Sequence, residues 1–276
     1  MQPEIVARIY RRCVRPLDRA RIRRRDGARL EALLAGADLR RRPPVFVVVM
    51  PKTLGWLVPC LKLIPAEVPV VLLLNGVPRR EIPEIEAESG GRPLMSLSVS
   101  PGAWARHGTV LDLLVSACAG DFFLLDHDCY VFDASLFDPI EWQGDEFLGG
   151  VDRQGFFTIN ERTGLRFPRT HFLAVRRDRL LRLREEHGVG CEKASKTPHA
   201  VATLLAEVGI GDDNFPPARM PFYDTLQLAM AVAFACGWTV RDLPVEARGI
   251  SHVGGTARSL NQPGLSATGP VAGDGE

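Results

Sequence analysis

The stretch that decides the fold is Phe122-Phe-Leu-Leu-Asp126-His-Asp128-Cys-Tyr-Val-Phe-Asp133. The apolar run at its start predicts a strand that is buried on both faces, as in a parallel sheet. The run leads directly into two carboxylates separated by one residue. Because alternate residues of an extended chain share a side, Asp126 and Asp128 can reach one cation. Oxygen ligands suit Mg²⁺ or Mn²⁺, although the same tripeptide alone is equally typical of a solvated turn.

Working outward from this stretch, short apolar runs alternate with helical patterns. The runs that predict strands are Val45–Met50, Val68–Leu74, Leu94–Val99 and Phe122–Leu125. The helical patterns between them are Trp56–Ile64, Arg80–Glu88 and Thr109–Ala119. This alternation predicts an α/β fold with a mostly parallel central sheet and helices on both faces. In such sheets ligands bind beyond the carboxyl ends of the strands, which is where the two aspartates lie.

The second half of the chain is less regular. Apolar runs predict strands at Phe147–Val151, His171–Val175 and Trp238–Leu243. Predicted helices are Arg177–His187, a helix capped by Thr197 and beginning at Pro198, and Thr225–Cys236, opened by Asp224. We divide the chain into a basic helical extension (1–44), a first half (45–133), a second half (134–260) and a disordered tail (261–276).

Charge is distributed unevenly along the 276 residues. The formal net charge is +1, yet residues 1–42 contain 13 arginines and 5 acids and carry +8. Two interpretations of this extension remain open: a solvated helical collar packed on the domain, or a basic surface that contacts an acidic membrane peripherally. No aromatic residues are interleaved with the charges as in nucleic-acid-binding modules, so we expect no nucleic-acid partner.

The cysteines and the hydropathy pattern bear on the environment of the protein. The 6 cysteines include no CxxC pair, which argues against a zinc framework and for reduced thiols. No apolar run is long enough to span a bilayer, and no signal-peptide pattern follows Met1. We therefore expect a cytoplasmic protein.

Several motifs around the two aspartates occur in a recognisable order. Ala105-Arg106-His107-Gly108 precedes a helix, and Gly120-Asp121 precedes the apolar strand and its Asp-x-Asp. Farther along come a strand ending in Arg176-Arg177, the Asp224-opened helix, and His252-Val-Gly-Gly. In this order they resemble the family 2 glycosyltransferases of the GT-A fold. His107 stands where that family has Asn, and Tyr223 where it has Glu.

The resemblance implies a function and a set of site residues. It implies transfer of a sugar from a nucleoside-diphosphate sugar to an acceptor hydroxyl, dependent on Mn²⁺ or Mg²⁺. Asp126, Asp128 and His252 would be the metal ligands. Asp224 would be the catalytic base of an inverting displacement. Residues 45–133 would bind the nucleotide sugar, and residues 134–260 would bind the acceptor, whether a glycan, a lipid-linked glycan or a small molecule.

The donor would lie across the ends of the first strands. By resemblance, Pro51, Asn75, Arg106 and Asp126 would contact it. Each residue outside the Asp-x-Asp has a simpler interpretation that the sequence leaves open. Asn75 can form an Asn-Gly turn, Arg106 can be a surface cation, Asp224 can cap a helix, and His252 can be a loop histidine.

Three other functions remain as alternatives. Asp126-His-Asp128 also resembles the nucleophile motif of haloacid-dehalogenase-like phosphatases, but that motif normally ends the first strand of its domain. A sugar-nucleotide pyrophosphorylase would need a Gly-rich signature that Pro51-Lys-Thr-Leu-Gly does not provide. A catalytically degenerate sugar-nucleotide-binding protein is favoured by the departures at His107 and Tyr223.

Overall fold

The computed structural model describes residues 15–36, 42–100, 102–153, 156–159, 163–211, 223–246 and 248–254. The predicted disordered tail, 261–276, and the first part of the basic extension lie outside these ranges. Within the described ranges, no helix is long and apolar enough to cross a membrane.

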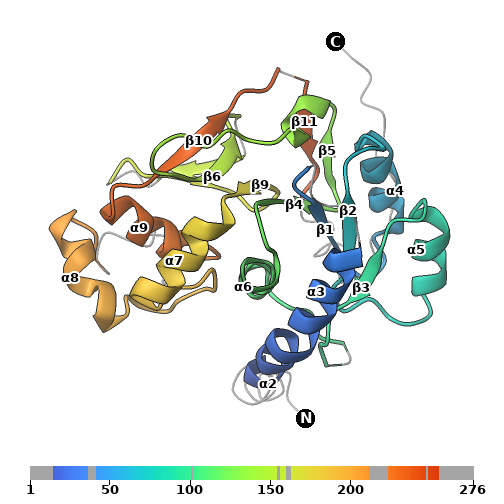
Figure 1. Cartoon of the computed structure of the whole chain (residues 1–276), viewed down its shortest axis with the longest axis horizontal. Coiled ribbons are helices and arrows are strands. Elements are labelled where there is room, and N and C mark those ends of the chain that lie inside the picture. The colour runs from blue at the N-terminus through green and yellow to red at the C-terminus, as the bar shows by residue number, and fades with distance from the viewer. Residues whose placement is uncertain are drawn as a thin grey trace, which may run out of the picture.

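A central sheet of seven strands has the order β10-β6-β9-β4-β1-β2-β3 (Figure 1). Strand β9 runs antiparallel to both of its neighbours, and the other pairs are parallel. The predicted α/β fold with a mostly parallel sheet is therefore confirmed. The strands are β1 (Val45–Val49), β2 (Val70–Leu74), β3 (Leu94–Ser96), β4 (Phe122–Asp126), β6 (Glu146–Val151), β9 (Phe172–Val175) and β10 (Thr239–Leu243).

Two small antiparallel sheets accompany the central one. Strand β5 (Cys129–Val131) pairs with β11 (Ile250–His252), and β7 (Phe157–Ile159) pairs with β8 (Arg166–Pro168). Between β5 and β6 the chain forms the short 3₁₀ helix η3 (Ala134–Phe137). Two residues separate the end of β4 from the start of β5, so the β5–β11 pair extends the sheet edge at which the two aspartates lie.

The unbroken apolar character of β1, β2 and β4 follows from their position, because every residue of these strands is buried. Side chains alternate between the two faces of the sheet, and each face has its own core. Phe46 and Val48 belong to one apolar cluster, whereas Val45, Val47 and Val49 belong to the other. Two separate cores require helices on both faces.

The helices divide accordingly. Helices α4 (Leu54–Leu63) and α5 (Ile82–Glu88) contribute to the core that contains Val47. The other core receives side chains from four helices: α6 (His107–Ala117), α7 (Arg177–His187), α8 (His199–Glu207) and α9 (Gln227–Ala235). Helices on both faces of the sheet are therefore confirmed.

The described part of the N-terminal extension is one helical segment, residues 15–36, which we call the basic helix. It consists of α2 (Arg15–Arg21), the π-helical turn η2 (Ile22–Asp26) and α3 (Gly27–Gly36), so Gly27 does not interrupt it. Ile22 and Leu30 are buried in the same core as α6. The predicted Arg-rich helical extension is thus confirmed for these residues, and it packs directly on the domain.

Two predicted helix starts are wrong. Helix α8 begins at His199 with Pro198 at the capping position, because the Thr197 hydroxyl bonds to the Tyr223 hydroxyl at 2.6 Å. Helix α9 begins at Gln227, so Asp224 does not open it. Leu226 adopts a φ of 65° and its N–H bonds to the Cys191 carbonyl at 2.9 Å, which delays the helix by two residues.

Candidate metal and sugar-nucleotide site

The two aspartates of the Asp-x-Asp stand at the carboxyl end of β4. Asp126 is the last residue of the strand, and Asp128 lies in the turn that leads into β5. They are 8% and 3% exposed, which is unusual for carboxylates and requires partners inside the protein. The interpretation of this tripeptide as a solvated turn is therefore wrong.

His171 is the nearest partner of Asp126 and lies in the turn directly before β9. Because β9 runs antiparallel to β4, its first residues lie beside the end of β4. The His171 carbonyl accepts the Asp126 N–H at 2.9 Å, and His171 Nδ1 lies 3.3 Å from Asp126 Oδ2. The backbone pairing thus positions the imidazole beside the carboxylate.

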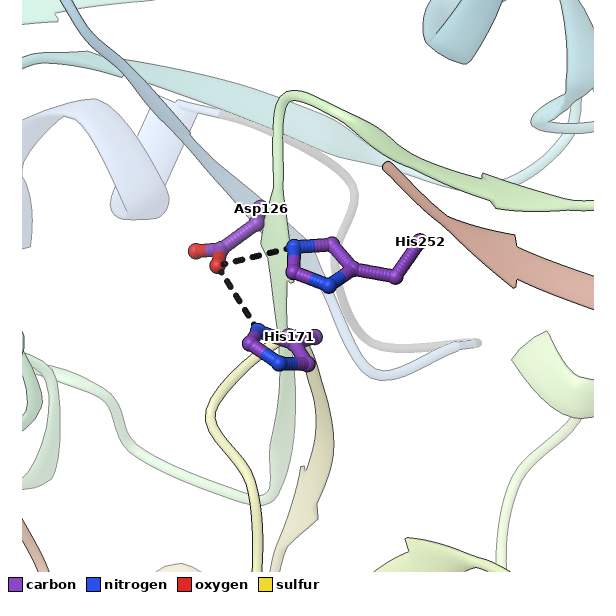
Figure 2. A group of neighbouring side chains, drawn as sticks. All are labelled: Asp126, His171 and His252. Carbon is purple, nitrogen blue, oxygen red and sulfur yellow. Dashed lines mark hydrogen bonds and ion pairs between the residues drawn. The ribbon is translucent and has the colours of Figure 1, made fainter. Parts of the chain in front are cut away.

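His252 reaches the same place from the far end of the chain. Strand β11 pairs with β5 so that His252 lies opposite Cys129, and the Val253 N–H donates to the Asp128 carbonyl at 3.1 Å. His252 Nε2 is 3.3 Å from Asp128 Oδ1 and 3.9 Å from Asp126 Oδ2. The rings of His252 and His171 are stacked with centroids 3.4 Å apart (Figure 2).

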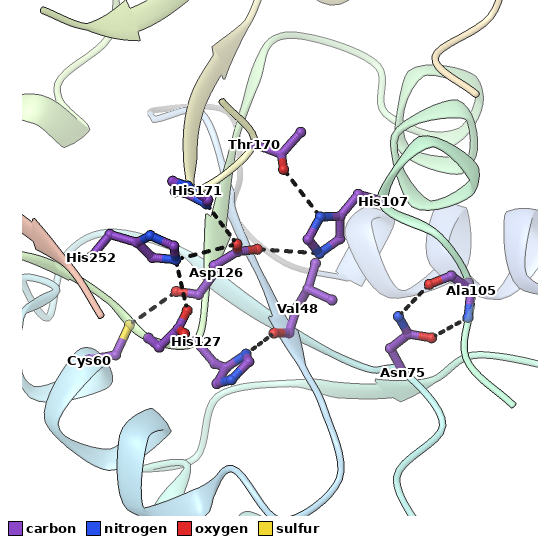
Figure 3. A network of polar contacts seen from close by, with 11 residues as sticks. Val48, Cys60, Asn75, Ala105, His107, Asp126, His127, Thr170, His171 and His252 are labelled. Carbon is purple, nitrogen blue, oxygen red and sulfur yellow. Dashed lines mark hydrogen bonds and ion pairs between the residues drawn. The ribbon is translucent and has the colours of Figure 1, made fainter. Parts of the chain in front are cut away.

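A third histidine approaches the other oxygen of Asp126. His107, the first residue of α6, has Nε2 3.4 Å from Asp126 Oδ1 and Nδ1 3.2 Å from the Thr170 hydroxyl (Figure 3). Burial raises the pKa of Asp126, but His107 and His171 more than offset this, so its pKa is held below the ordinary value. The carboxylate is thereby kept charged in a buried position.

The donor set fits a divalent cation. One carboxylate oxygen of Asp126 and one nitrogen each of His171 and His252 all lie within 4.8 Å of one another. Two cysteines behind the cluster do not belong to this set. Burial raises the pKa of Cys60 to about 12, and its thiol donates to the Cys129 carbonyl at 3.3 Å. A thiol that stays protonated is a poor metal ligand, so the available donors are imidazole and carboxylate.

The residues that the sequence predicts to contact the sugar-nucleotide donor lie at the same sheet edge. They differ in what they contact in the structure. Pro51 is in the turn after β1, partly exposed. Asn75, 1% exposed, donates to the Ala105 carbonyl at 2.8 Å and accepts the Ala105 N–H at 2.6 Å. Its amide is thus committed to the loop before α6 and holds Arg106 in place. No described residue makes a hydrogen bond or ion pair with the half-buried Arg106 side chain.

Asp224 lies apart from the cluster, in the segment before α9. Its Oδ1 pairs with the Lys193 ammonium and accepts the Thr225 N–H at 2.7 Å. Within the described residues, Oδ2 has no such contact. The side chain is 34% exposed, which leaves it reachable from solvent. Tyr223, which replaces the Glu of the resembled family, is fully buried and pairs its backbone with Ala194.

Sequence reasoning missed His171 and left the role of His107 open. The sequence shows His171 only as the start of an apolar run, and nothing local distinguishes it from a loop residue. Its role depends on β9 being antiparallel inside a mostly parallel sheet. His107 belongs to the same motif as Arg106, and that position could have identified it as a candidate site residue. Its contact with Asp126 is visible only in the folded chain.

A family model matches more than half of the chain. The model of the family described as "StrH glycosyltransferase N-terminal domain" matches residues 20–180. No curated protein matches the sequence. Among solved structures, the mannosyltransferase PcManGT of Pyrobaculum calidifontis, in complex with GDP-Man and Mn²⁺, is 12% identical, with a TM-score of 0.44, over 81% of this chain and 65% of that one.

Two further solved structures are similar at the same distant level. Glucosyl-3-phosphoglycerate synthase of Mycobacterium tuberculosis, in complex with Mn²⁺, UDP and glucosyl-3-phosphoglycerate, is 15% identical with a TM-score of 0.38, covering 85% of this chain and 81% of that one. LgtC is 14% identical with a TM-score of 0.34, over 49% of this chain. The match spans 57% of LgtC and 40% of GlyE from Streptococcus pneumoniae, about half the length of these two structures.

Proposed function

This chain belongs to the family of the StrH glycosyltransferase N-terminal domain, and on that premise we propose that it transfers a sugar from a nucleoside-diphosphate sugar to an acceptor hydroxyl with the help of a divalent cation. The observation that carries the proposal is the convergence of Asp126, His171 and His252 at the carboxyl edge of the sheet. The family match favours this function over the phosphatase and pyrophosphorylase alternatives. The degenerate binding protein is separated from it by the experiments below.

The cation would be held by Asp126, His171 and His252, with Asp128 beside them. When bound, such an ion neutralises the charge that develops on a diphosphate leaving group. The neighbouring groups support this role. His107 and Asp128 fix the orientation of Asp126 and His252 through contacts of 3.4 and 3.3 Å. Oriented ligands bind metal more tightly than mobile ones.

We propose Mn²⁺ rather than Mg²⁺ as the ion. Mg²⁺ is bound through oxygen atoms and keeps much of its water, whereas imidazole nitrogen suits later divalent metals. The Asp-x-Asp alone is compatible with either ion. Two of the three converging donors are imidazoles, from His171 and His252. The nitrogen-rich donor set therefore favours a transition-metal ion over Mg²⁺, and Mn²⁺ is the one of the two predicted ions in that class.

Arg106 would bind the diphosphate of the donor. Its guanidinium has no partner among the described residues, and a planar guanidinium binds phosphate oxygens in pairs. Asn75 forms hydrogen bonds with the backbone of Ala105, the residue before Arg106. These bonds support a role for Asn75 in positioning the loop before α6. Pro51 in the turn after β1 would border the nucleotide.

The acceptor hydroxyl would lose its proton to Asp224. Its Oδ2 is available while Oδ1 is held by Lys193 and the Thr225 N–H. A carboxylate fixed through one oxygen presents the other in a defined direction, as general-base catalysis requires. A single displacement with such a base inverts the anomeric carbon, and we propose that stereochemistry.

Nucleoside-diphosphate binding tests the proposal directly. Thermal unfolding would be measured with UDP, GDP and dTDP, each with and without Mn²⁺. A ligand at 100 times its Kd stabilises a fold by about 2.7 kcal/mol. We expect Mn²⁺-dependent stabilisation by one nucleotide, lost in Asp128→Ala. His199→Ala removes an exposed histidine at the start of α8 and is the matched control. Stabilisation of Asp128→Ala equal to that of the parent chain would refute the metal site.

Turnover separates an enzyme from a degenerate binding protein. Release of nucleoside diphosphate from the matching sugar donor would be followed with Mn²⁺ and a set of candidate acceptors. Acceptor-dependent release supports transfer. Binding of the nucleotide with no release from any sugar donor would support the degenerate binding protein instead.

A further inference from the structure

Two acidic side chains of the basic helix, Asp18 and Asp26, are buried against the domain. Asp26 is fully buried and accepts the Ser98 N–H and hydroxyl, both at 2.7 Å. Asp18, 5% exposed, accepts the Ser100 hydroxyl at 2.7 Å. These two acids therefore face the domain, and each also pairs with one arginine of the same helix, Asp18 with Arg21 and Asp26 with Arg29.

The arginines on the outer face fall into two groups. Arg19, Arg21 and Arg29 pair with acids that are at least partly buried. Arg23, Arg24 and Arg25 are exposed, and no described carboxylate lies within ion-pair distance of them. They are three consecutive residues at the centre of the π-helical turn η2. Three unpaired guanidinium groups on one turn form a concentrated positive charge.

Apolar surface accompanies this charge. Leu17, in α2, is 58% exposed, the largest exposed fraction among the exposed large hydrophobic side chains of the described residues. A hollow of about 430 Å³ lies between Pro16, Arg19, Ala20, Arg23 and Arg24. An exposed apolar side chain next to unpaired arginines is the composition of a helix that lies at a membrane surface.

We propose that the outer face of the basic helix, formed by Leu17, Arg23, Arg24 and Arg25, docks on an anionic phospholipid surface. The guanidinium groups would bind headgroup phosphates, and Leu17 would enter the interface between headgroups and acyl chains. Free polyanions such as RNA offer phosphate without an apolar layer, so they would leave Leu17 in water. The exposed leucine is why the membrane is the favoured occupant.

Docking there would orient the proposed active site. Asp18 and Asp26 tie the basic helix to Ser98 and Ser100, in the loop between β3 and α6 that also carries Arg106. Hydrogen bonds therefore connect the basic helix, which carries the docking face, to the loop that carries Arg106. The proposal does not depend on the proposed catalytic activity, because its test measures binding to vesicles alone.

Co-sedimentation of the full chain with vesicles tests the docking. Phosphatidylcholine vesicles would be compared with vesicles that also contain phosphatidylglycerol, at low and high salt. We expect binding to the anionic vesicles only, weakened by salt. Each arginine near such a surface contributes about fivefold in affinity, so Arg23→Gln/Arg24→Gln should bind about thirtyfold more weakly.

A matched variant removes charge elsewhere. Arg79 and Arg80 are also exposed neighbours without a described partner, next to α5. The Arg79→Gln/Arg80→Gln variant should bind vesicles as the parent does. The loss of binding caused by Leu17→Gln should be larger at high salt than at low salt, because salt screens the contribution of the arginines. Equal loss in both arginine pairs, or equal binding to neutral vesicles, would overturn the proposal. Binding to RNA without binding to anionic vesicles would overturn it in favour of a soluble polyanion.

Discussion

Asp126 and Asp224 are the two carboxylates on which the proposed chemistry depends, and they are held in opposite ways. Asp126 has a side chain that is 11% exposed and contacts histidines from α6, from the turn before β9 and from β11. Asp224 has a side chain that is 34% exposed and makes one ion pair, to Lys193. One carboxylate is surrounded by histidine side chains, and the other is held by one lysine and the N–H of the next residue.

The difference indicates which half of the site exists before substrate binds. The residues of the candidate metal site are already together in the protein alone, since their ligand atoms lie within 4.8 Å of one another. One carboxylate oxygen of Asp224 has no described contact. A general base needs such an oxygen to accept the proton of an acceptor hydroxyl. Substitutions at the cluster should therefore affect metal and nucleotide binding, whereas substitution of Asp224 should affect only the chemical step.

Asp126→Asn should produce the largest effect. The amide keeps the shape of the side chain but loses the charge that pairs with His107 and His171. Loss of a group that organises charge stabilisation costs about 10²–10³-fold, and we expect turnover to fall by about 10³-fold with loss of Mn²⁺-dependent nucleotide binding. Calorimetric titration of Mn²⁺ and nucleotide checks this. Unchanged Mn²⁺ affinity would remove Asp126 from the metal site.

Asp224→Asn should reduce kcat by about 10²-fold or more while the affinity for nucleotide and Mn²⁺ stays that of the parent. The reason is that its contacts, to Lys193 and Thr225, include none of the metal donors. Steady-state kinetics with the true acceptor, together with nucleotide titration, separates the two quantities. Near-parental kcat would assign Asp224 to loop structure, through its pairing with Lys193.

His171→Ala should weaken Mn²⁺ binding by at least about tenfold, the lower size of effect seen when a neighbour of a metal ligand is lost. The structure supplies His171 as a donor, whereas the resemblance implied only Asp126, Asp128 and His252. Titration of the metal alone, with His199→Ala as the control, measures the effect. Equal Mn²⁺ affinity of both variants would restrict the site to the three residues implied by the resemblance.

Asn75→Ala should produce the smallest functional change and a clear loss of stability. Removing the amide leaves the buried N–H and C=O of Ala105 without their partner, which costs about 1–3 kcal/mol of unfolding free energy. Because the loop before α6 then loosens, nucleotide affinity should drop severalfold while Mn²⁺ affinity remains. Denaturant unfolding and titration check both parts. A stable variant with normal nucleotide affinity would contradict the positioning role.

The strands of the central sheet were predicted close to their observed bounds in both halves, whereas the starts of two helices were not. Strands buried on both faces must be apolar throughout, so β1, β2 and β4 are visible as continuous runs. The start of α9 was predicted two residues early, because the left-handed Leu226 is fixed by a contact with the distant Cys191 carbonyl. A local pattern holds no information about such a contact.

The sequence by itself determined the α/β class, the strand that carries the Asp-x-Asp and the resemblance to glycosyltransferases. These follow from hydrophobic periodicity and motif order, which are local along the chain. Only the tertiary structure decided that β9 is antiparallel, that His171 and His107 join Asp126, and that Asn75 serves the loop before α6. Each of these depends on strand direction or on a contact between residues at least 19 positions apart, because side chains meet where the backbone pairing brings them.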